Sequence, residues 1–223
     1  MLKPYRLVVF DWEGTLGDTL GQIINSVATQ AKRLHLGELD EAIARQHVEL
    51  GLVMAVKKAF PKLRDDQHEA LLEAVNLALV SRTTDVYLIP GATEFVQRLD
   101  AIGVFLAIAS NKGQQSLLRV LHASELDRYF KVTRSAGQVA PKPAPDMLIE
   151  ILDEFNVEPA QALMIGDSLN DIDMARQVGV DAIGVDFYHQ QEIQLKNAGA
   201  MAVFDDYKKL ADFLNIADIE RTL

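Results

Sequence analysis

The 223-residue chain contains no cysteine. Disulfide frameworks, thiolate nucleophiles and cysteine-bound zinc or iron–sulfur sites are therefore excluded. Positive charge is also scarce, because 22 lysines and arginines face 32 aspartates and glutamates, for a formal net charge of −10. A protein this acidic, with no basic run, is a poor partner for nucleic acid or for an anionic membrane. An anionic ligand stays possible, since a bound cation can reverse the field inside a pocket.

Long hydrophobic runs are missing as well. The first apolar stretch, at residues 7–10, is too short for the core of a signal peptide and leads directly into Asp11. No segment approaches the roughly 20 apolar residues that a membrane span needs. We therefore expect a cytoplasmic protein without a membrane partner.

Short apolar runs bounded by turn residues indicate buried strands. They lie at residues 7–10, 104–109, 163–165, 182–185 and, more weakly, 200–204. Helical patterns lie between the later runs, at residues 93–101, 114–122, 145–155 and 171–178. With 49% apolar residues the chain can bury a sizeable core. The alternation predicts an α/β fold, a doubly wound, mainly parallel Rossmann-like sheet with helices on both faces.

Residues 19–82 interrupt this alternation and contain no convincing strand. One helical stripe of apolar side chains comprises Leu20, Ile23, Ile24, Val27, Ala31 and Leu34. A second stripe comprises Leu71, Leu72, Val75 and Leu79. A shorter helix is expected over residues 50–60, ending before Pro61. We predict that residues 19–82 form an all-helical cap, inserted into an α/β catalytic core of residues 1–18 and 83–223.

Polar side chains follow three of the predicted strands. Asp11 comes directly after the first strand, and Ser110 and Asn111 come after the second. Asp167 follows the third strand, with Asp171 in the same loop. Such residues are common in ordinary turns. Because ligands bind beyond the carboxyl ends of strands in an open parallel sheet, we expect the three segments to converge on one site.

In these segments the chain resembles the haloacid dehalogenase superfamily of hydrolases. The run D-W-E-G-T-L-G-D-T, which begins at Asp11, resembles the first motif of the family, and S-N-K at residues 110–112 resembles the second. The third motif corresponds to Lys142 within A-P-K-P-A-P-D, and the fourth to G-D-S-L-N-D at residues 166–171. The resemblance covers residues 7 to about 185 and includes a helical cap after the first motif.

The resemblance implies a phosphatase, similar to phosphoglycolate phosphatases, that hydrolyses a small phosphomonoester through a phospho-aspartate. Asp11 corresponds to the nucleophile, which splits one displacement into two easier ones. Mg²⁺ is the implied cofactor, and it prefers oxygen ligands. The implied metal ligands are Asp11, the backbone carbonyl of Glu13, Asp167 and, directly or through water, Asp171. Lys142 would supply positive charge beside the nucleophile and the phosphate.

Further residues of the motifs would bind the substrate. Ser110, with the backbone amide of Asn111, would hydrogen-bond a phosphoryl oxygen. Thr15 would order the substrate-binding loop that follows the nucleophile. In the cap, His47 and Glu49 lie where residues of similar phosphatases face the substrate.

Glu13 departs from the family pattern, in which an aspartate at this position acts as general acid and then as base. Glutamate carries the same carboxyl group on one more methylene and can serve the same role. Trp12 is similar to a residue of phosphonoacetaldehyde hydrolases, so a C–P hydrolase that uses Lys57 or Lys58 as a Schiff-base lysine is an alternative. A phosphomutase and a catalytically weak phosphate-binding protein are two others.

The expected partner is a small phosphorylated metabolite. Phosphoglycolate, a sugar phosphate and a nucleotide all stay open, because side chains of the cap would select among them. The chain is expected to be a monomer or a homodimer.

Overall fold

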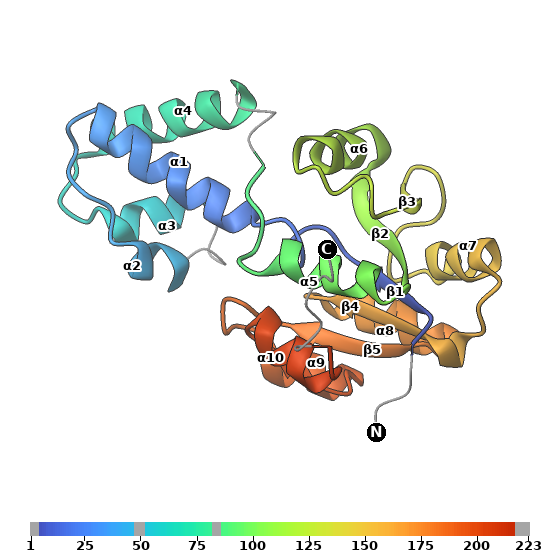
Figure 1. Ribbon diagram of the computed structural model, residues 1–223. Coiled ribbons are helices and arrows are strands. Elements are labelled where there is room, and N and C mark those ends of the chain that lie inside the picture. The colour runs from blue at the N-terminus through green and yellow to red at the C-terminus, as the bar shows by residue number, and fades with distance from the viewer. Residues whose placement is uncertain (1–4, 47–51, 82–85, 217–223) are drawn as a thin grey trace. The chain divides into compact units, whose positions relative to one another are not determined.

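The computed structural model describes residues 5–46, 52–81 and 86–216 of the chain (Figure 1). Two compact units make up the protein: a core unit of Met1–Asp18 and Leu88–Leu223, and a helical unit of Thr19–Tyr87. The helical unit extends beyond residue 82, where the sequence placed its end. The Tyr87 hydroxyl accepts a hydrogen bond of 2.7 Å from Asn25 Nδ2, which attaches the end of the unit to its first helix. None of the described helices is long and apolar enough to cross a membrane.

The core unit is built on a sheet of six parallel strands in the order β3-β2-β1-β4-β5-β6. The strands are β1 (Leu7–Phe10), β2 (Phe105–Gly113), β3 (Val132–Ala136), β4 (Ala162–Gly166), β5 (Asp181–Val185) and β6 (Val203–Phe204). Strand β1 lies between β2 and β4, and Phe10 is paired with Ile108 on one side and Ile165 on the other. The predicted Rossmann-like α/β fold is confirmed, and the strands that precede the candidate site residues are neighbours.

In the described part of the core unit, six helices pack on the sheet. They are α5 (Ala92–Ala101), α6 (Gln114–Ala123), α7 (Asp146–Phe155), α8 (Leu169–Val178), α9 (Glu192–Ala198) and α10 (Tyr207–Phe213). Leu7 and Val9 belong to the same buried cluster as Ile151 of α7. The Phe10 ring meets Phe95 of α5 edge-on, with centroids 6.1 Å apart. Because successive side chains of a strand point to opposite faces, β1 is buried from both sides, which explains its continuous apolar sequence.

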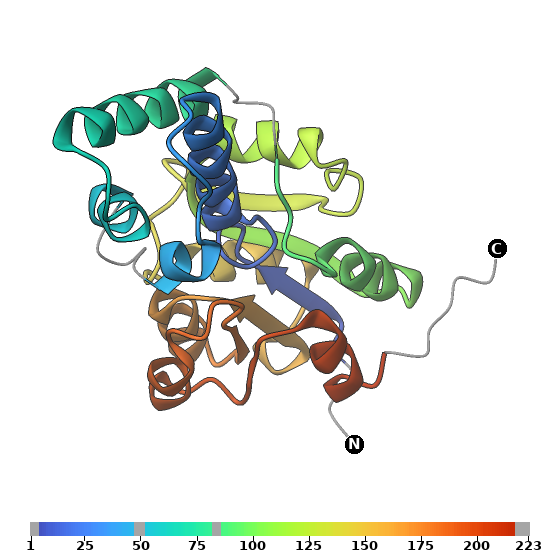
Figure 2. The same ribbon diagram turned by 90° about the vertical axis from the view of Figure 1, so that its left-hand side faces the viewer.

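The helical unit contains α1 (Thr19–Arg33), α2 (Glu41–Gln46), α3 (Leu52–Ala59) and α4 (Asp65–Ser81). Helices α1 and α4 lie side by side in both views (Figures 1 and 2). Ile24, Val27 and Ala31 of α1 share a buried cluster with Leu71 and Val75 of α4. The two apolar stripes in the sequence are therefore the facing sides of these helices.

Several elements differ from the sequence-based expectation. The strand expected at residues 200–204 is reduced to Val203–Phe204, and β2 continues past residue 109 to Gly113. Strand β3 and helices α2, α9 and α10 were not predicted. Strand β3 has the sequence VTRSA and lies at the edge of the sheet, so it lacks the apolar run of a strand covered on both faces. The three helices span six or seven residues, too few to show a helical period clearly.

Candidate active site

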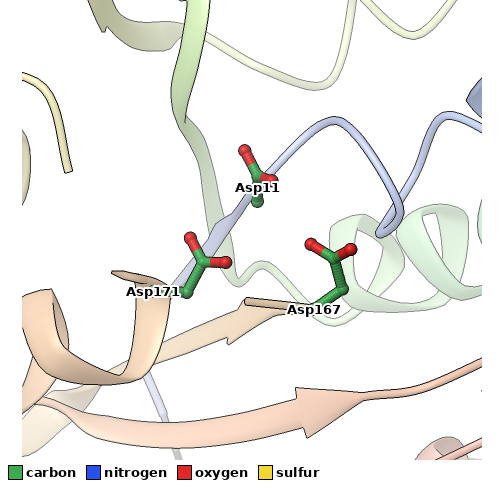
Figure 3. Close-up of side chains that lie close together, drawn as sticks. All are labelled: Asp11, Asp167 and Asp171. Carbon is green, nitrogen blue, oxygen red and sulfur yellow. The ribbon is translucent and has the colours of Figure 1, made fainter. Parts of the chain in front are cut away.

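Three aspartates meet beyond the carboxyl ends of two neighbouring strands. Asp11 follows β1, Asp167 follows β4, and Asp171 lies in the first turn of α8 (Figure 3). Each offers a carboxylate oxygen, and the three atoms lie within 4.8 Å of one another. Asp171 is fully buried and Asp11 is 7% exposed. The fold thus brings together three acids that are up to 160 positions apart in the sequence.

Two glycines leave the space that these carboxylates occupy. Gly14 has a φ of +70°, and a Cβ atom there would lie 1.9 Å from Asp167 Oδ2. A Cβ atom on Gly166 would lie 2.3 Å from Asp171 Cγ. Both distances are far below van der Waals contact. The glycines of the first and fourth motifs are therefore required for the acids to approach.

Lys142 places its ammonium group between two of the acids. Its Nζ lies 2.7 Å from Asp11 Oδ1 and 2.6 Å from Asp171 Oδ1, and its side chain is 3% exposed. The loop that carries Lys142 is tied to the end of β2 by the Asn111 side chain. Asn111 Nδ2 donates to the Lys142 carbonyl at 3.1 Å, and the Lys142 amide donates to Asn111 Oδ1 at 2.7 Å. These two hydrogen bonds orient the lysine, a role for the Asn111 side chain that sequence analysis missed.

Asp171 is further held by the start of its own helix. Its Oδ2 accepts hydrogen bonds from the Ser168 hydroxyl at 2.6 Å and from the Ser168 amide at 3.1 Å. This is a capping box, in which the side chain of the cap residue and that of the third helical residue each accept a hydrogen bond from the other residue's backbone amide. Helix α8 therefore begins at Leu169, before the residue at which the sequence placed its start.

The electrostatics of the cluster show an excess of negative charge. Burial raises the pKa of Asp11 to about 6, and the Lys142 ammonium opposes this shift. Burial and the charges of Asp11 and Asp171 raise the pKa of Asp167 to about 8. For Lys142, burial lowers the pKa, but Asp11 and Asp171 more than offset it, so the pKa is raised overall. One ammonium thus faces three carboxylates, which favours a further cation.

Ser110, in the last part of β2, and Glu13, in the loop after β1, lie beside this cluster. Ser110 is 1% exposed, and its hydroxyl accepts a hydrogen bond of 3.3 Å from the Lys112 amide. Glu13 Oε1 lies 2.8 Å from Lys112 Nζ. Sequence analysis assigned Lys112 no role. No local pattern could have revealed the pair, because its members are 99 positions apart.

Thr15 is fully buried in the loop after Asp11. Its backbone carbonyl accepts a hydrogen bond of 2.8 Å from the hydroxyl of Tyr207, the first residue of α10. Helix α10 therefore holds the loop after Asp11 in place through this hydrogen bond. Sequence analysis did not find Tyr207, which lies in a helix that it also missed.

The comparisons with known proteins agree with the strand-end motifs. The family model described as haloacid dehalogenase-like hydrolase matches residues 8–185. The chain belongs to this family. The resemblance inferred from the motifs is thereby confirmed, and the protein is a haloacid dehalogenase-like hydrolase.

Individual relatives match this hydrolase along almost its whole length. It is 31% identical to a protein named probable phosphatase IndB from Dickeya dadantii, covering 94% of this chain and 92% of that one. It is 29% identical to a phosphoglycolate phosphatase from Rhodospirillum rubrum, covering 94% and 90%. In fold it matches the crystal structure of a hydrolase of the same family from Deinococcus radiodurans, with bound phosphate and sodium. That match has a TM-score of 0.71 at 22% identity and covers 96% of each chain.

The acids of this haloacid dehalogenase-like hydrolase suit a small, hard divalent cation. Carboxylate oxygens are the ligands that Mg²⁺ prefers, and the three carboxylates outnumber the one ammonium of Lys142 beside them. Asp11 and Asp167 are the best candidates for direct ligands. Both carboxylate oxygens of Asp171 already accept hydrogen bonds from Lys142 or Ser168.

The remaining predicted residues belong to the helical unit. His47 and Glu49 lie outside the described residues. Lys57 and Lys58 are exposed on α3, and Lys57 Nζ is 3.9 Å from Asp65 Oδ1. A Schiff-base lysine needs a desolvated or otherwise perturbed amine. Within the helical unit both side chains are exposed, so the described contacts of that unit add no support for the C–P hydrolase alternative.

Proposed function

We propose that this hydrolase removes phosphate from a small phosphomonoester, in the manner of a phosphoglycolate phosphatase, through a phospho-aspartate on Asp11. The observation that carries the proposal is the buried ion-pair network of Asp11, Lys142 and Asp171, with Asp167 beside it. A carboxylate at a strand end next to a fixed ammonium is suited to attack on a phosphoryl group. The names of the relatives from D. dadantii and R. rubrum support the same reaction class.

Mg²⁺ is the proposed cofactor. Asp11, the backbone carbonyl of Glu13 and Asp167 would hold it, with Asp171 in a supporting position. When bound, the cation supplies the positive charge that lets a carboxylate approach an anionic phosphoryl group. The crowding of Asp11, Asp167 and Asp171 around one ammonium, which together with burial raises the pKa of Asp167 to about 8, supports this assignment.

In the first step, an Asp11 carboxylate oxygen attacks phosphorus and the ester P–O bond breaks. The departing alkoxide takes a proton from the Glu13 carboxyl group. The product then leaves as an alcohol, and Glu13 becomes a carboxylate. Proton transfer of this kind contributes roughly 10²–10⁴-fold. Lys142 stays beside Asp11 and stabilises the charge that gathers on the phosphoryl oxygens.

In the second step, a water molecule attacks the phosphorus of the phospho-aspartate. Glu13 accepts a proton from that water, the bond between phosphorus and the Asp11 oxygen breaks, and inorganic phosphate forms. Asp11 and Glu13 return to their starting protonation states. Ser110 and the backbone amide of Asn111 would hydrogen-bond a phosphoryl oxygen through both steps.

The substrate is proposed to be a small phosphorylated metabolite, and selection among such metabolites is assigned to side chains of the helical unit, including His47 and Glu49. A monomer or homodimer in the cytoplasm, without nucleic acid or membrane partners, fits the net charge of −10.

The test is a screen of the purified protein with Mg²⁺ against small phosphoesters, alkyl and aryl. We expect turnover that stops in EDTA and returns with added Mg²⁺. Asp11→Asn should keep the fold and lose turnover by about 10⁴-fold or more, since the nucleophile is removed. Asp173→Asn is the matched control, because Asp173 lies on the same helix as Asp171 but pairs with Arg176 at the surface.

Full turnover in EDTA would contradict the role of the cation. Substantial turnover by Asp11→Asn would contradict the role of the nucleophile. Equal losses in Asp11→Asn and Asp173→Asn would point to a general effect of removing charge.

A further inference from the structure

Lys112, near the carboxyl end of β2, contacts the loop after β1. Its Nζ lies 2.8 Å from Glu13 Oε1, across a sequence separation of 99 residues. The contact is possible because β1 and β2 are parallel neighbours, with Phe10 paired to Ile108, so that the end of β2 and the loop after β1 lie at the same edge of the sheet. The second motif is thereby joined to the acid–base residue of the first.

Lys112 is restrained at both of its ends. Its backbone amide donates to the buried Ser110 hydroxyl at 3.3 Å, and its ammonium is paired with Glu13. The Lys112 side chain is 21% exposed, whereas that of Glu13 is 49% exposed. A half-exposed glutamate has several rotamers of similar energy, and an ion pair to a restrained partner selects among them.

The extra methylene of Glu13 is what lets it reach this lysine. A carbon–carbon bond is about 1.5 Å long, so an aspartate at position 13 would leave a gap of roughly 4 Å to the ammonium, beyond hydrogen-bond distance. The contact therefore depends on the longer side chain that distinguishes position 13 from the family pattern. Neither residue makes the contact without the other.

We propose that Lys112 is a positioning residue for Glu13 and holds its carboxyl group for the acid and base steps. The inference rests on the proposed function. A general acid must lie within hydrogen-bond reach of the proton that it transfers. A displacement of about 1 Å can cost about a hundredfold in rate, so holding the longer side chain in place matters for turnover.

The chain offers a matched control for an ordinary ion pair of the same exposure. Arg134 of β3 lies 2.5 Å from Glu150 of α7, with side chains 21% and 45% exposed. This pair has nearly the same solvent access as the Lys112–Glu13 pair but involves none of the strand-end residues. Any effect of losing a half-exposed ion pair as such should appear in Arg134→Met as well as in Lys112→Met.

The experiment measures kcat and KM with Mg²⁺ for an alkyl phosphate and for p-nitrophenyl phosphate, the latter because its phenolate leaves without a proton. We expect Lys112→Met to lower kcat on the alkyl ester by about tenfold or more, as for a misplaced general acid, with KM changed by less than about twofold. Lys112→Arg should recover most of the rate. Arg134→Met should stay within about twofold of the unmodified protein.

Coupling to Glu13 is tested by a double-mutant cycle. In the Glu13→Gln background, Lys112→Met should lower kcat by less than about a further twofold, because the carboxyl group that Lys112 positions is already absent. Acid quenching during turnover of p-nitrophenyl phosphate should show phospho-Asp11 accumulating in Lys112→Met. The second step needs Glu13 as a base whichever ester formed the intermediate.

Three results for Lys112→Met would overturn the inference. The first is a loss of kcat in the Glu13→Gln background as large as in the unmodified protein, and the second is an equal loss of first-step rate on both esters. The third is a rise in KM with kcat unchanged, which would mean that Lys112 binds substrate. Thermal unfolding of Lys112→Met and Lys112→Gln shows whether either variant is folded. If the unmodified protein turns over both esters and Asp11→Asn does not, any of these results contradicts the inference but not the proposed function. If the unmodified protein turns over no phosphoester, the proposed function fails and the inference fails with it.

Discussion

Lys142 and Lys112 both pair with carboxylates of the loop after β1, but their environments differ. The Lys142 side chain is 3% exposed and lies between Asp11 and Asp171, whereas the Lys112 side chain is 21% exposed and pairs with the half-exposed Glu13. A buried charge without a partner is strongly destabilising, while an exposed pair contributes little to stability. In the proposed mechanism the first lysine would therefore serve the fold and the chemistry together, whereas the second would serve the chemistry with little effect on the fold.

The largest expected effect is on Lys142. Lys142→Met leaves Asp11 and Asp171 buried together without their shared cation, so the free energy of unfolding should fall by about 3–5 kcal/mol. Turnover should fall by about a hundredfold or more, because charge stabilisation at the phosphoryl group is lost. Lys112→Met should change the free energy of unfolding by less than about 1 kcal/mol.

Urea unfolding of both variants, without Mg²⁺, measures this contrast. Similar destabilisation by the two substitutions would show that burial does not separate the two lysines.

A substitution of intermediate size tests how tightly the buried network is packed. Gly166→Ala would place a methyl group 2.3 Å from Asp171 Cγ, so the carboxylate or the strand must move. Overpacking of this kind costs about 1–3 kcal/mol, and turnover should fall as Asp171 and Lys142 shift.

Gly113→Ala is the control for that substitution, because no atom lies within 4 Å of a Cβ built at Gly113 and its φ is −63°. Chemical denaturation and steady-state kinetics of both variants decide the point. A harmless Gly166→Ala would mean that the network tolerates displacement and is not closely packed around Asp171.

A smaller loss of stability than for Gly166→Ala is expected when the support of the loop after Asp11 is removed. Tyr207→Phe removes the hydrogen bond to the Thr15 carbonyl and leaves that carbonyl buried, which should cost about 1 kcal/mol of stability. A modest loss of turnover should accompany it if α10 helps to hold the loop. Unchanged unfolding and unchanged kinetics would show that Tyr207 packs beside the loop without supporting it.

Much of the core unit could be predicted from sequence, because its central strands are buried on both faces. The run at residues 7–10 and the runs before Ser110 and Asp167 are continuously apolar, and each ends in polar residues. The convergence of those ends follows from the geometry of a parallel sheet. The strands at the edges of the sheet were harder to predict, since β3 is polar and β6 is very short.

Short-range patterns in the sequence were thus sufficient to predict the fold class, the family and the acids at the strand ends. Burial and turn chemistry leave such patterns in the sequence. The contacts that set charge and orientation depend on folding at long range. The Lys142 ammonium between Asp11 and Asp171, the Asn111 clamp on the Lys142 loop, and the reach of Lys112 to Glu13 join residues 29–131 positions apart. No short-range pattern encodes such pairs, since their partners become neighbours only when parallel strands align their carboxyl ends.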